Sequence, residues 1–298
     1  MKTVYYITSL LCCMTMLQAC SSEEEIRKSE TKVPLEINIG NSTRSVIEGT
    51  TIPTQTSFGI FGIPSSYYYD GTIVEDINNV SVFYDGKCTL QKDIWLDNSI
   101  IYLRAYYPYK ESVQRYLELN VYDQIDYLYG ESVLQGHPYY VSNTNPKTDI
   151  LFKHILSRIT FKVRHTNKIT KDFKLYKVST VPVCWSALFD VLTRKYSEQS
   201  MNGDPQFKID VNVTEEFSSF DLLMIPFKSD RVRIGLSDDQ NKYYSCNLLN
   251  VNWEAGQQYT YEITFDDSGI KVGEVVITPW EPTTQSGIDI TDNNLVTD

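Results

Sequence analysis

The residue types that most often carry enzyme chemistry are few and scattered in this sequence. The three histidines are His137, His154 and His165. They lack the i,i+4 spacing and the HExxH pattern of a zinc site, and the chain has no GxSxG motif and no Walker loop. The acidic pairs at 238–239 and 266–267 stand between expected strands, where such residues usually form solvated turns. Two carboxylates brought together only by the fold could still form a glycosidase pair. We nevertheless expect no catalytic residues, no metal site and no cofactor, and therefore a protein that is not an enzyme.

Cys20 is the thiol whose position predicts a chemical role. Before it stand a basic Lys2, an apolar run over residues 4–17 and a small residue, Ala19, which is the order of a secretory signal peptide. The run is too short for a useful membrane span. The LQAC sequence at 17–20 resembles a bacterial lipobox, which implies cleavage after residue 19 and a lipid, palmitate among its acyl chains, on Cys20. Acyl chains that bury CH₂ groups at roughly 0.8 kcal/mol each would anchor the protein to the outer membrane. The alternative is an ordinary signal peptide followed by a chance cysteine.

The residues after Cys20 read as a tether. The run SSEEE at 21–25 opens an acidic linker over 20–31, and like charges in such a run are usually solvated. The run also resembles the surface-export signal of Bacteroidetes lipoproteins. We therefore expect a surface-exposed lipoprotein.

The other mature cysteines are Cys88, Cys184 and Cys246. They are odd in number, far apart and outside any CxxC motif, so no disulfide framework is indicated, although one disulfide is possible. We favour three small buried side chains.

Composition predicts an all-β protein. Without residues 1–19 the chain has 26 basic and 38 acidic residues, a net charge of −12, which argues against nucleic acid as a partner. The 22 Tyr and 12 Phe, with many Val, Ile and Thr, suit pleated, half-buried surfaces. No window keeps a 3.6-residue period, and Gly and Pro recur at short intervals.

Alternating apolar residues place the first strand at 33–39, with Val33, Leu35, Ile37 and Ile39 on one face. A polar loop over 41–45 follows it. In the first half we expect further strands at 57–63 and 100–107, a two-residue hairpin turn at 85–86 between strands 80–84 and 87–90, and less regular structure over 111–149. The stretch 150–163 should end in a strand from 158, whereas its first part could be a helical turn or an extended crossing.

The second half contains short strands at the spacing of a β-sandwich. We expect them at 173–178, 208–213, 219–225, 231–236, 242–248, 258–265 and 270–277. A boundary near residue 155 then gives an N-terminal domain over 32–154 and a C-terminal domain with a polar tail over 155–298, each near the usual domain size.

Five segments resemble the fimbrillin family of Bacteroidetes, the subunits of major and minor fimbriae. They are LRAYYPY (103–109), DQIDYLY (123–129), LFKHILSRITF (151–161), WEAGQQYTY (253–261) and VVITPW (275–280). Each is weak alone, but they occur in family order behind a lipobox. We expect packing roles for them: Trp253 and Trp280 cap the core, residues 255–256 form a turn, and Tyr259, Tyr261 and Ile263 share a face.

The resemblance implies two transthyretin-like β-sandwich domains in tandem and an assembly mechanism. A protease would cut after Arg44, before Ser45, and release the first strand. A donor strand of another fimbrial subunit would then fill the vacated groove by β-strand addition. The donor candidate is the C-terminal tail, where Ile288 and Ile290 alternate with polar residues. The chain would be a structural or accessory subunit, at the tip, in the stalk or as an anchor, of a fimbria that supports adhesion to a host or bacterial surface.

A surface glycan-binding lipoprotein is the alternative. It would share the lipobox, the acidic tether and the β-sandwich domains, and it would display aromatic side chains to sugar rings. The tyrosine runs at 67–69 and 139–140 keep this interpretation open.

Overall fold

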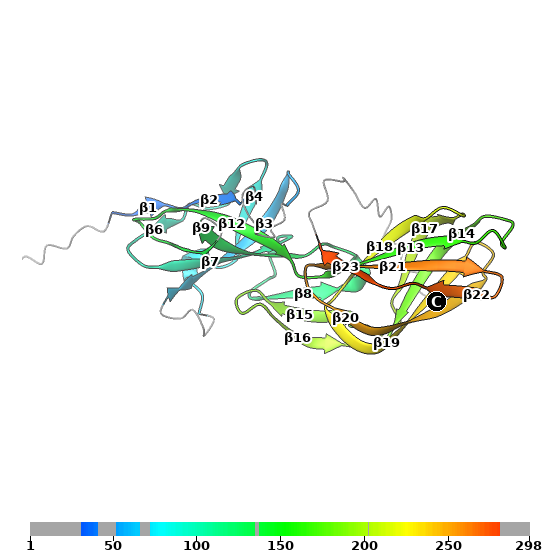
Figure 1. The fold of residues 1–298 in the computed structure, drawn as a ribbon. Helices are drawn as coiled ribbons and strands as arrows, with labels where there is room; N and C mark the ends of the chain where they lie inside the picture. The colour runs from blue at the N-terminus through cyan, green and yellow to red at the C-terminus, as the bar shows by residue number, and fades with distance from the viewer. Residues whose placement is uncertain (1–30, 41–51, 66–71, 135–136, 202, 281–298) are drawn as a thin grey trace, which may run out of the picture. The chain divides into compact units, whose positions relative to one another are not determined.

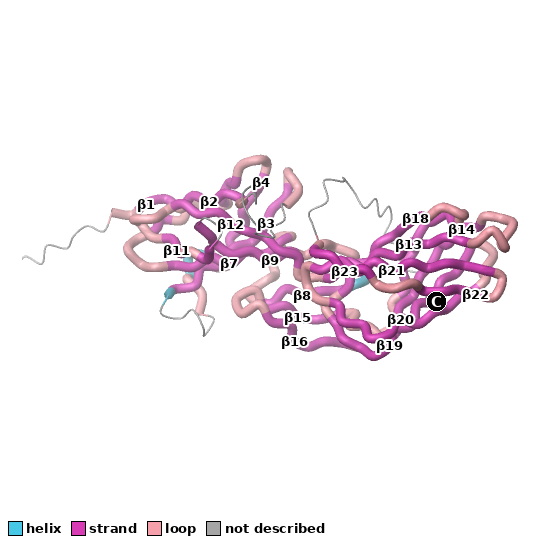
Figure 2. The backbone as a smooth tube through the Cα atoms, viewed as in Figure 1, coloured by secondary structure: helices cyan, strands magenta, loops and turns pink. Residues whose placement is uncertain are grey.

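The structure, a computed structural model, describes residues 31–40, 52–65, 72–134, 137–201 and 203–280. Inter-residue contacts group the chain into two units, Met1–Lys32 and Val33–Asp298, and the account below concerns the second. Its described residues contain no α-helix; only two short 3-10 turns, η2 (Glu75–Ile77) and η3 (Val121–Asp123), interrupt the strands (Figure 1 and Figure 2). The predicted all-β class is confirmed.

The strands before residue 155 form mainly one sheet. Its path runs in the order β2-β12-β9-β7-β3-β4-β5, with β10 paired to β9 and β11 paired to β7. The strands are β2 (Glu36–Ile39), β3 (Thr56–Pro64), β4 (Val80–Tyr84), β5 (Cys88–Leu90), β7 (Ile101–Tyr107), β9 (Leu128–Leu134), β10 (His137–Pro138), β11 (Tyr140–Val141) and β12 (Lys147–His154). A separate short pair joins β1 (Val33–Pro34) to β6 (Trp95–Leu96).

Both faces of this nine-stranded sheet are apolar near its centre. Phe58 and Ile60 of β3 point to one face and Phe61 to the other, and all three are fully buried. Gly59 lies between them opposite Tyr106 of β7, and a Cβ at residue 59 would lie 2.2 Å from the Tyr106 ring. The absence of a side chain therefore lets Tyr106 lie flat across β3, where its hydroxyl donates to Asn79 Oδ1 at 2.7 Å.

The strands after residue 155 form two packed sheets and, together with β8 from before it, a third, smaller one. The five-stranded sheet contains β13 (Ser157–His165), β18 (Ser218–Met224), β21 (Gln257–Asp266), β22 (Gly269–Val272) and β23 (Val276–Pro279). The four-stranded sheet contains β14 (Phe173–Val181), β17 (Gln206–Val213), β19 (Phe227–Asp238) and β20 (Tyr243–Trp253). The three-stranded sheet contains β8 (Tyr116–Asn120), β15 (Ser186–Asp190) and β16 (Lys195–Ser200).

The two larger sheets enclose a sandwich core. Phe161 of β13 and Ile263 of β21 are fully buried, as are Val178 of β14 and Ile234 of β19 from the facing sheet. Each of these residues alternates with a more exposed neighbour along its strand, as expected when one sheet face is buried.

Several sequence-based boundaries were wrong. The stretch from 150 is no helical turn: it belongs to β12, which starts at Lys147 and lies inside the sheet. The described residues of 111–149 contain β8 to β11 and the start of β12, because tertiary pairing stabilises strands whose local pattern is weak. The hairpin turn has three residues, since Tyr84 pairs with Cys88. The expected strand at 33–39 is two strands, because β1 pairs with β6 and β2 with β12, so the segment changes partner at Leu35. The expected strand at 270–277 is also two strands, β22 and β23, and β15 and β16 were missed.

The last strand of the nine-stranded sheet, β12, ends at His154, and the first of the five-stranded sheet, β13, begins at Ser157. One strand crosses this division: β8, from the first half, pairs with β15 of the second. The division into two domains near residue 155 stays a prediction.

Candidate functional site

The first strand occupies one end of the nine-stranded sheet. β2 runs parallel to β12, with Ile37 opposite Thr148 and Ile39 opposite Ile150. Backbone hydrogen bonds extend this pairing at both ends, from Glu36 N to Pro146 O at 2.9 Å and from Gly40 N to Ile150 O at 3.0 Å. The opposite edge of β2 has no partner strand among the described residues, so the first strand is a terminal strand of this sheet.

The side chains of this strand alternate as its sequence predicts. Leu35 and Ile37 are 4% and 5% exposed, whereas Glu36 and Asn38 point to solvent and Ile39 is half-buried. Burying two aliphatic side chains of this size contributes roughly 1.5–3 kcal/mol each. Val33 lies at the start of the segment, in β1, opposite Leu96.

The side chains of Leu35 and Ile37 occupy an apolar slot. Leu35 and Ile37 belong to the same buried cluster as Ile94, Leu96 and Ile150. The Leu35 N–H donates to the Ile94 carbonyl at 2.9 Å, so the strand is held on its β6 side as well as by β12. Removal of the first strand would expose this slot and the backbone edge of β12.

The polar contact on the solvent side of the strand is weak. Glu36 Oε2 lies 2.6 Å from Lys147 Nζ, but the two side chains are 54% and 67% exposed. Exposed ion pairs of this kind contribute about 0–1 kcal/mol. Apolar burial and the backbone ladder therefore hold the strand in place.

Most of the other candidate residues lie outside the described residues. These are Cys20, Arg44, Ser45, Ile288 and Ile290. Their proposed roles in lipid attachment, cleavage and strand donation stay predictions. The structure thus brings together the plug residues Val33, Leu35, Ile37 and Ile39 and the apolar slot.

The segments that carried the resemblance have packing roles. Trp253 is buried and its Nε1 donates to Tyr261 Oη at 3.1 Å. Trp280 stacks on His154, with ring centroids 3.7 Å apart and the planes 7° from parallel, and His154 Nδ1 lies 2.8 Å from Asp126 Oδ1. The buried residues Tyr259 and Tyr261 lie on one face of β21, as predicted.

Gln124 has a role that the sequence did not disclose. Its side-chain amide donates to the Leu223 carbonyl at 3.1 Å and accepts from the Leu223 N–H at 2.9 Å. A single side chain thereby satisfies a backbone donor and acceptor on the outer edge of β18. Exposed edges invite pairing with other chains, and this contact blocks part of one.

Sequence reasoning also missed a buried polar centre at Asp190. The carboxylate accepts from Arg115 Nη2 at 2.7 Å, from Thr193 Oγ1 at 2.7 Å and from the Leu192 N–H at 2.9 Å. Burial raises the pKa of Asp190, but the hydrogen bonds from Arg115, Thr193 and Leu192 outweigh it, and the pKa lies below the ordinary value. No local signal joins residues 115 and 190, because only the pairing of β8 with β15 brings them together.

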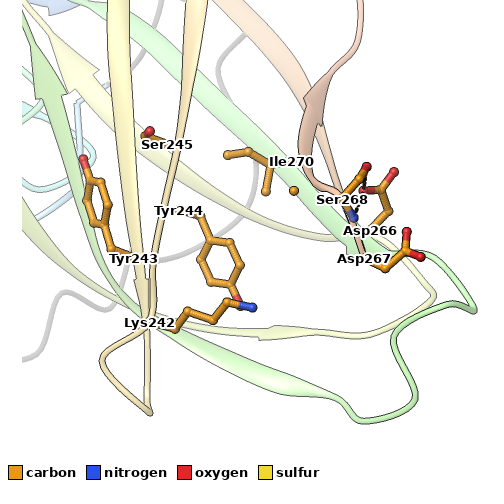
Figure 3. Close-up of a pocket in the computed structure, with 9 residues that line it drawn as sticks. Lys242, Tyr243, Tyr244, Ser245, Asp266, Asp267, Ser268 and Ile270 are labelled. Carbon is orange, nitrogen blue, oxygen red and sulfur yellow. Dashed lines mark hydrogen bonds between the residues drawn. The ribbon is translucent and has the colours of Figure 1, made fainter.

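A shallow cleft of about 370 Å³ lies between the start of β20 and the β21–β22 hairpin (Figure 3). Asp266 in the hairpin accepts from the Ser268 N–H at 2.9 Å and pairs with Lys271 at 2.8 Å. The hydrogen bonds from Lys271 and Ser268 hold the pKa of Asp266 well below its usual range. The carboxylate therefore serves as a turn acceptor, as expected for acidic residues at this position.

The described residues also contain no group of three or more side chains placed to hold a metal ion. Nor does any helix among them have the length and apolarity needed to cross a membrane.

Comparisons with known proteins identify the family and the fold. The sequence matches the fimbrillin-like family over residues 43–280. A crystal structure of a candidate cell adhesion protein of Bacteroides uniformis is similar, with 18% identity, coverage of 84% of this chain and 99% of that chain, and a TM-score of 0.60.

Two further crystal structures are similar. For a candidate cell adhesion protein of Bacteroides ovatus the identity is 16%, the coverage 85% and 98%, and the TM-score 0.61. A fimbrial protein of Bacteroides vulgatus has 14% identity, covers 84% of this chain and 99% of its own, and has a TM-score of 0.56. No curated protein matches the chain significantly.

At these identities the three structures establish a shared fold. The family match extends over most of the chain, and fimbrillin-like proteins are structural rather than catalytic. The chain therefore belongs to the fimbrillin-like family, as a non-enzymatic β-sandwich protein of the kind that forms cell-surface fimbriae.

Proposed function

We propose that this protein is a structural or accessory subunit of a fimbria and that its first strand is a removable plug. The lipid on Cys20 would deliver the chain to the outer membrane, cleavage after Arg44 would release residues 20–44, and a donor strand of another subunit would replace the plug. Fimbrial and adhesive function follows from the family, and the finer steps are our proposal.

The observation that carries the proposal is the position of β2. It is a terminal strand whose Ile37, together with Leu35 just before the strand, is buried in an apolar slot, and Arg44 follows it by five residues. Parallel pairing is slightly less stable per residue than antiparallel pairing. A replacement strand that ran antiparallel to β12 would therefore form a slightly more stable hydrogen-bond ladder with β12 than the parallel plug does.

The tail is our candidate donor. Ile288 and Ile290 have the i,i+2 spacing with which Leu35 and Ile37 occupy the slot. Backbone hydrogen bonds would give the exchange its strength and the two isoleucines its register.

Limited proteolysis tests the proposal. We expect trypsin to cut the purified precursor after Arg44, and the product to polymerise while the N-terminal fragment dissociates. Cys20→Ala gives soluble starting material, and Arg44→Gln, which removes the cleavage residue, is the matched control. Cleavage after Arg44 that leaves a permanent monomer would contradict the proposal.

A synthetic peptide of residues 33–40 provides a second readout. Added in excess during cleavage, it should occupy the slot and suppress polymerisation. The same peptide with Ile37→Asp should have no effect, because a carboxylate cannot enter the slot without losing its solvation.

A further inference from the structure

A basic surface covers the outer face of the four-stranded sheet β17-β14-β19-β20, although the chain carries a net charge of −11. Lys177 of β14 lies directly opposite Lys208 of β17, and Arg233 lies on the adjacent strand β19. Like charges directly opposite each other on a sheet are destabilising. None of the three makes an ion pair with another described residue; Asp210, on the same strand as Lys208, pairs with Lys174.

Between these cations the sheet carries a row of small side chains. Ser179, Gly235 and Ser245 are cross-strand neighbours on β14, β19 and β20, and Gln206 of β17 continues the row. Asn247 of β20 lies opposite Arg233. Hydroxyl and amide groups therefore lie beside the charged residues, although Val181 lies opposite Arg233 on its other side.

One aromatic ring lies across this row. Tyr243 of β20 is 55% exposed and projects from the opposite side of the strand to Tyr244 (Figure 3). A Cβ at residue 235 would lie 2.4 Å from the Tyr243 hydroxyl and 2.5 Å from Ser179 Oγ. The glycine thus leaves the space in which Tyr243 rests against the sheet, with half of its surface open to solvent.

We propose that this surface, formed by Lys177, Ser179, Lys208, Arg233 and Tyr243, binds an acidic polysaccharide. The ring of Tyr243 offers an apolar surface to the C–H face of a sugar ring. The three cations would pair with carboxylates or sulfates. The serine and amide groups would accept hydrogen bonds from sugar hydroxyls and donate hydrogen bonds to them.

The geometry disfavours other polyanions. The patch is centred on β14 and β19, whose two edges are both paired within the sheet, so an acidic peptide could not add to it as a strand. Nucleic acid would face a chain that is acidic overall and a patch with few cations. The inference goes beyond the proposed function, because it concerns a sheet face remote in sequence from the plug and does not depend on strand exchange.

Titration of the unlipidated full-length protein (Cys20→Ala) with three polymers tests the inference. We expect binding to dextran sulfate that weakens as NaCl rises, no binding to neutral dextran, and affinity for polyglutamate at least about tenfold lower than for dextran sulfate. Equal binding to polyglutamate, or no binding to dextran sulfate at low salt, would overturn the inference.

Variants locate the surface. Tyr243→Ala and the pair Lys177→Gln/Lys208→Gln should each weaken binding by about tenfold. Gly235→Ala should weaken it through displacement of the Tyr243 ring. The matched control is Lys87→Gln/Lys92→Gln, which neutralises two exposed lysines near the β4–β5 hairpin and should leave binding unchanged. An equal loss of affinity in the control pair and in Lys177→Gln/Lys208→Gln, or no loss in Tyr243→Ala, would show that the polysaccharide does not bind at this surface.

Discussion

At the residue scale, the polar groups inside this β-sandwich are joined across long distances in sequence. Asp190 accepts hydrogen bonds from two segments, the loop before β8 and the turn after β15. Arg158 and Asp221 join β13 to β18 in the same way. Each of these pairings stabilises the fold, because an unpaired buried polar atom costs about 1–3 kcal/mol.

Replacement of Asp190 tests how much its centre stabilises the fold. We expect Asp190→Ala to lower the free energy of unfolding by roughly 2–4 kcal/mol, because the Leu192 N–H and the Arg115 guanidinium lose their acceptor. Urea denaturation measures the change. Glu36→Ala, which removes an exposed ion pair, is the comparison and should cost less than about 1 kcal/mol. A similar loss for both variants would contradict this account.

His165 should make stability depend on pH. Burial lowers its pKa, but the hydrogen bonds from its ring to Asp172 and to the Thr166 carbonyl outweigh this, and the pKa is raised above 6.5. The stabilisation that charged His165 contributes to the folded protein is therefore fully present below pH 6.5 and is lost as the pH rises through the raised pKa.

Asp172→Asn removes the carboxylate that stabilises the charged ring. We expect the His165 pKa, followed by NMR titration, to fall, and the decrease in stability above pH 6.5 to become shallower. An unchanged pKa in Asp172→Asn would show that Asp172 does not hold the proton on His165.

At the element scale, the first strand can be tested by two substitutions one residue apart. Ile37 points into the slot and Asn38 points to solvent. We expect Ile37→Lys to destabilise the protein by roughly 3 kcal/mol or more, because it buries a charge and vacates an apolar site, and Asn38→Lys to change stability by less than about 0.5 kcal/mol. Thermal and urea unfolding measure both variants, and equal effects would show that the strand is not seated as described.

The element scale also explains which strands the sequence could predict. Residues 33–39 and 258–265 alternate apolar and polar residues, since each segment has one buried face. β9 and β12 are buried on both faces over part of their length, so their sequences show no clean alternation. β15 and β16 depend on β8, a partner that precedes them by about 70 residues.

At the scale of the whole molecule, the predicted lipid decides where the protein is held. We expect a clickable palmitate analogue, fed to expressing cells, to label the wild-type protein and not Cys20→Ala. Whole-cell protease treatment should remove the wild-type protein from the surface. Labelling that persists in Cys20→Ala would place the lipid elsewhere or exclude it.

The sequence by itself determined the all-β class, the first strand with its inward and outward faces, and the family, because alternation and short motifs are local properties of the chain. It also predicted lipidation at Cys20 and cleavage after Arg44. The tertiary structure decided the rest: which strand neighbours β2, the slot formed by Ile94, Leu96 and Ile150, the Asp190 centre, and the basic face with Tyr243 above Gly235. These features join residues tens of positions apart, and register between strands sets their geometry.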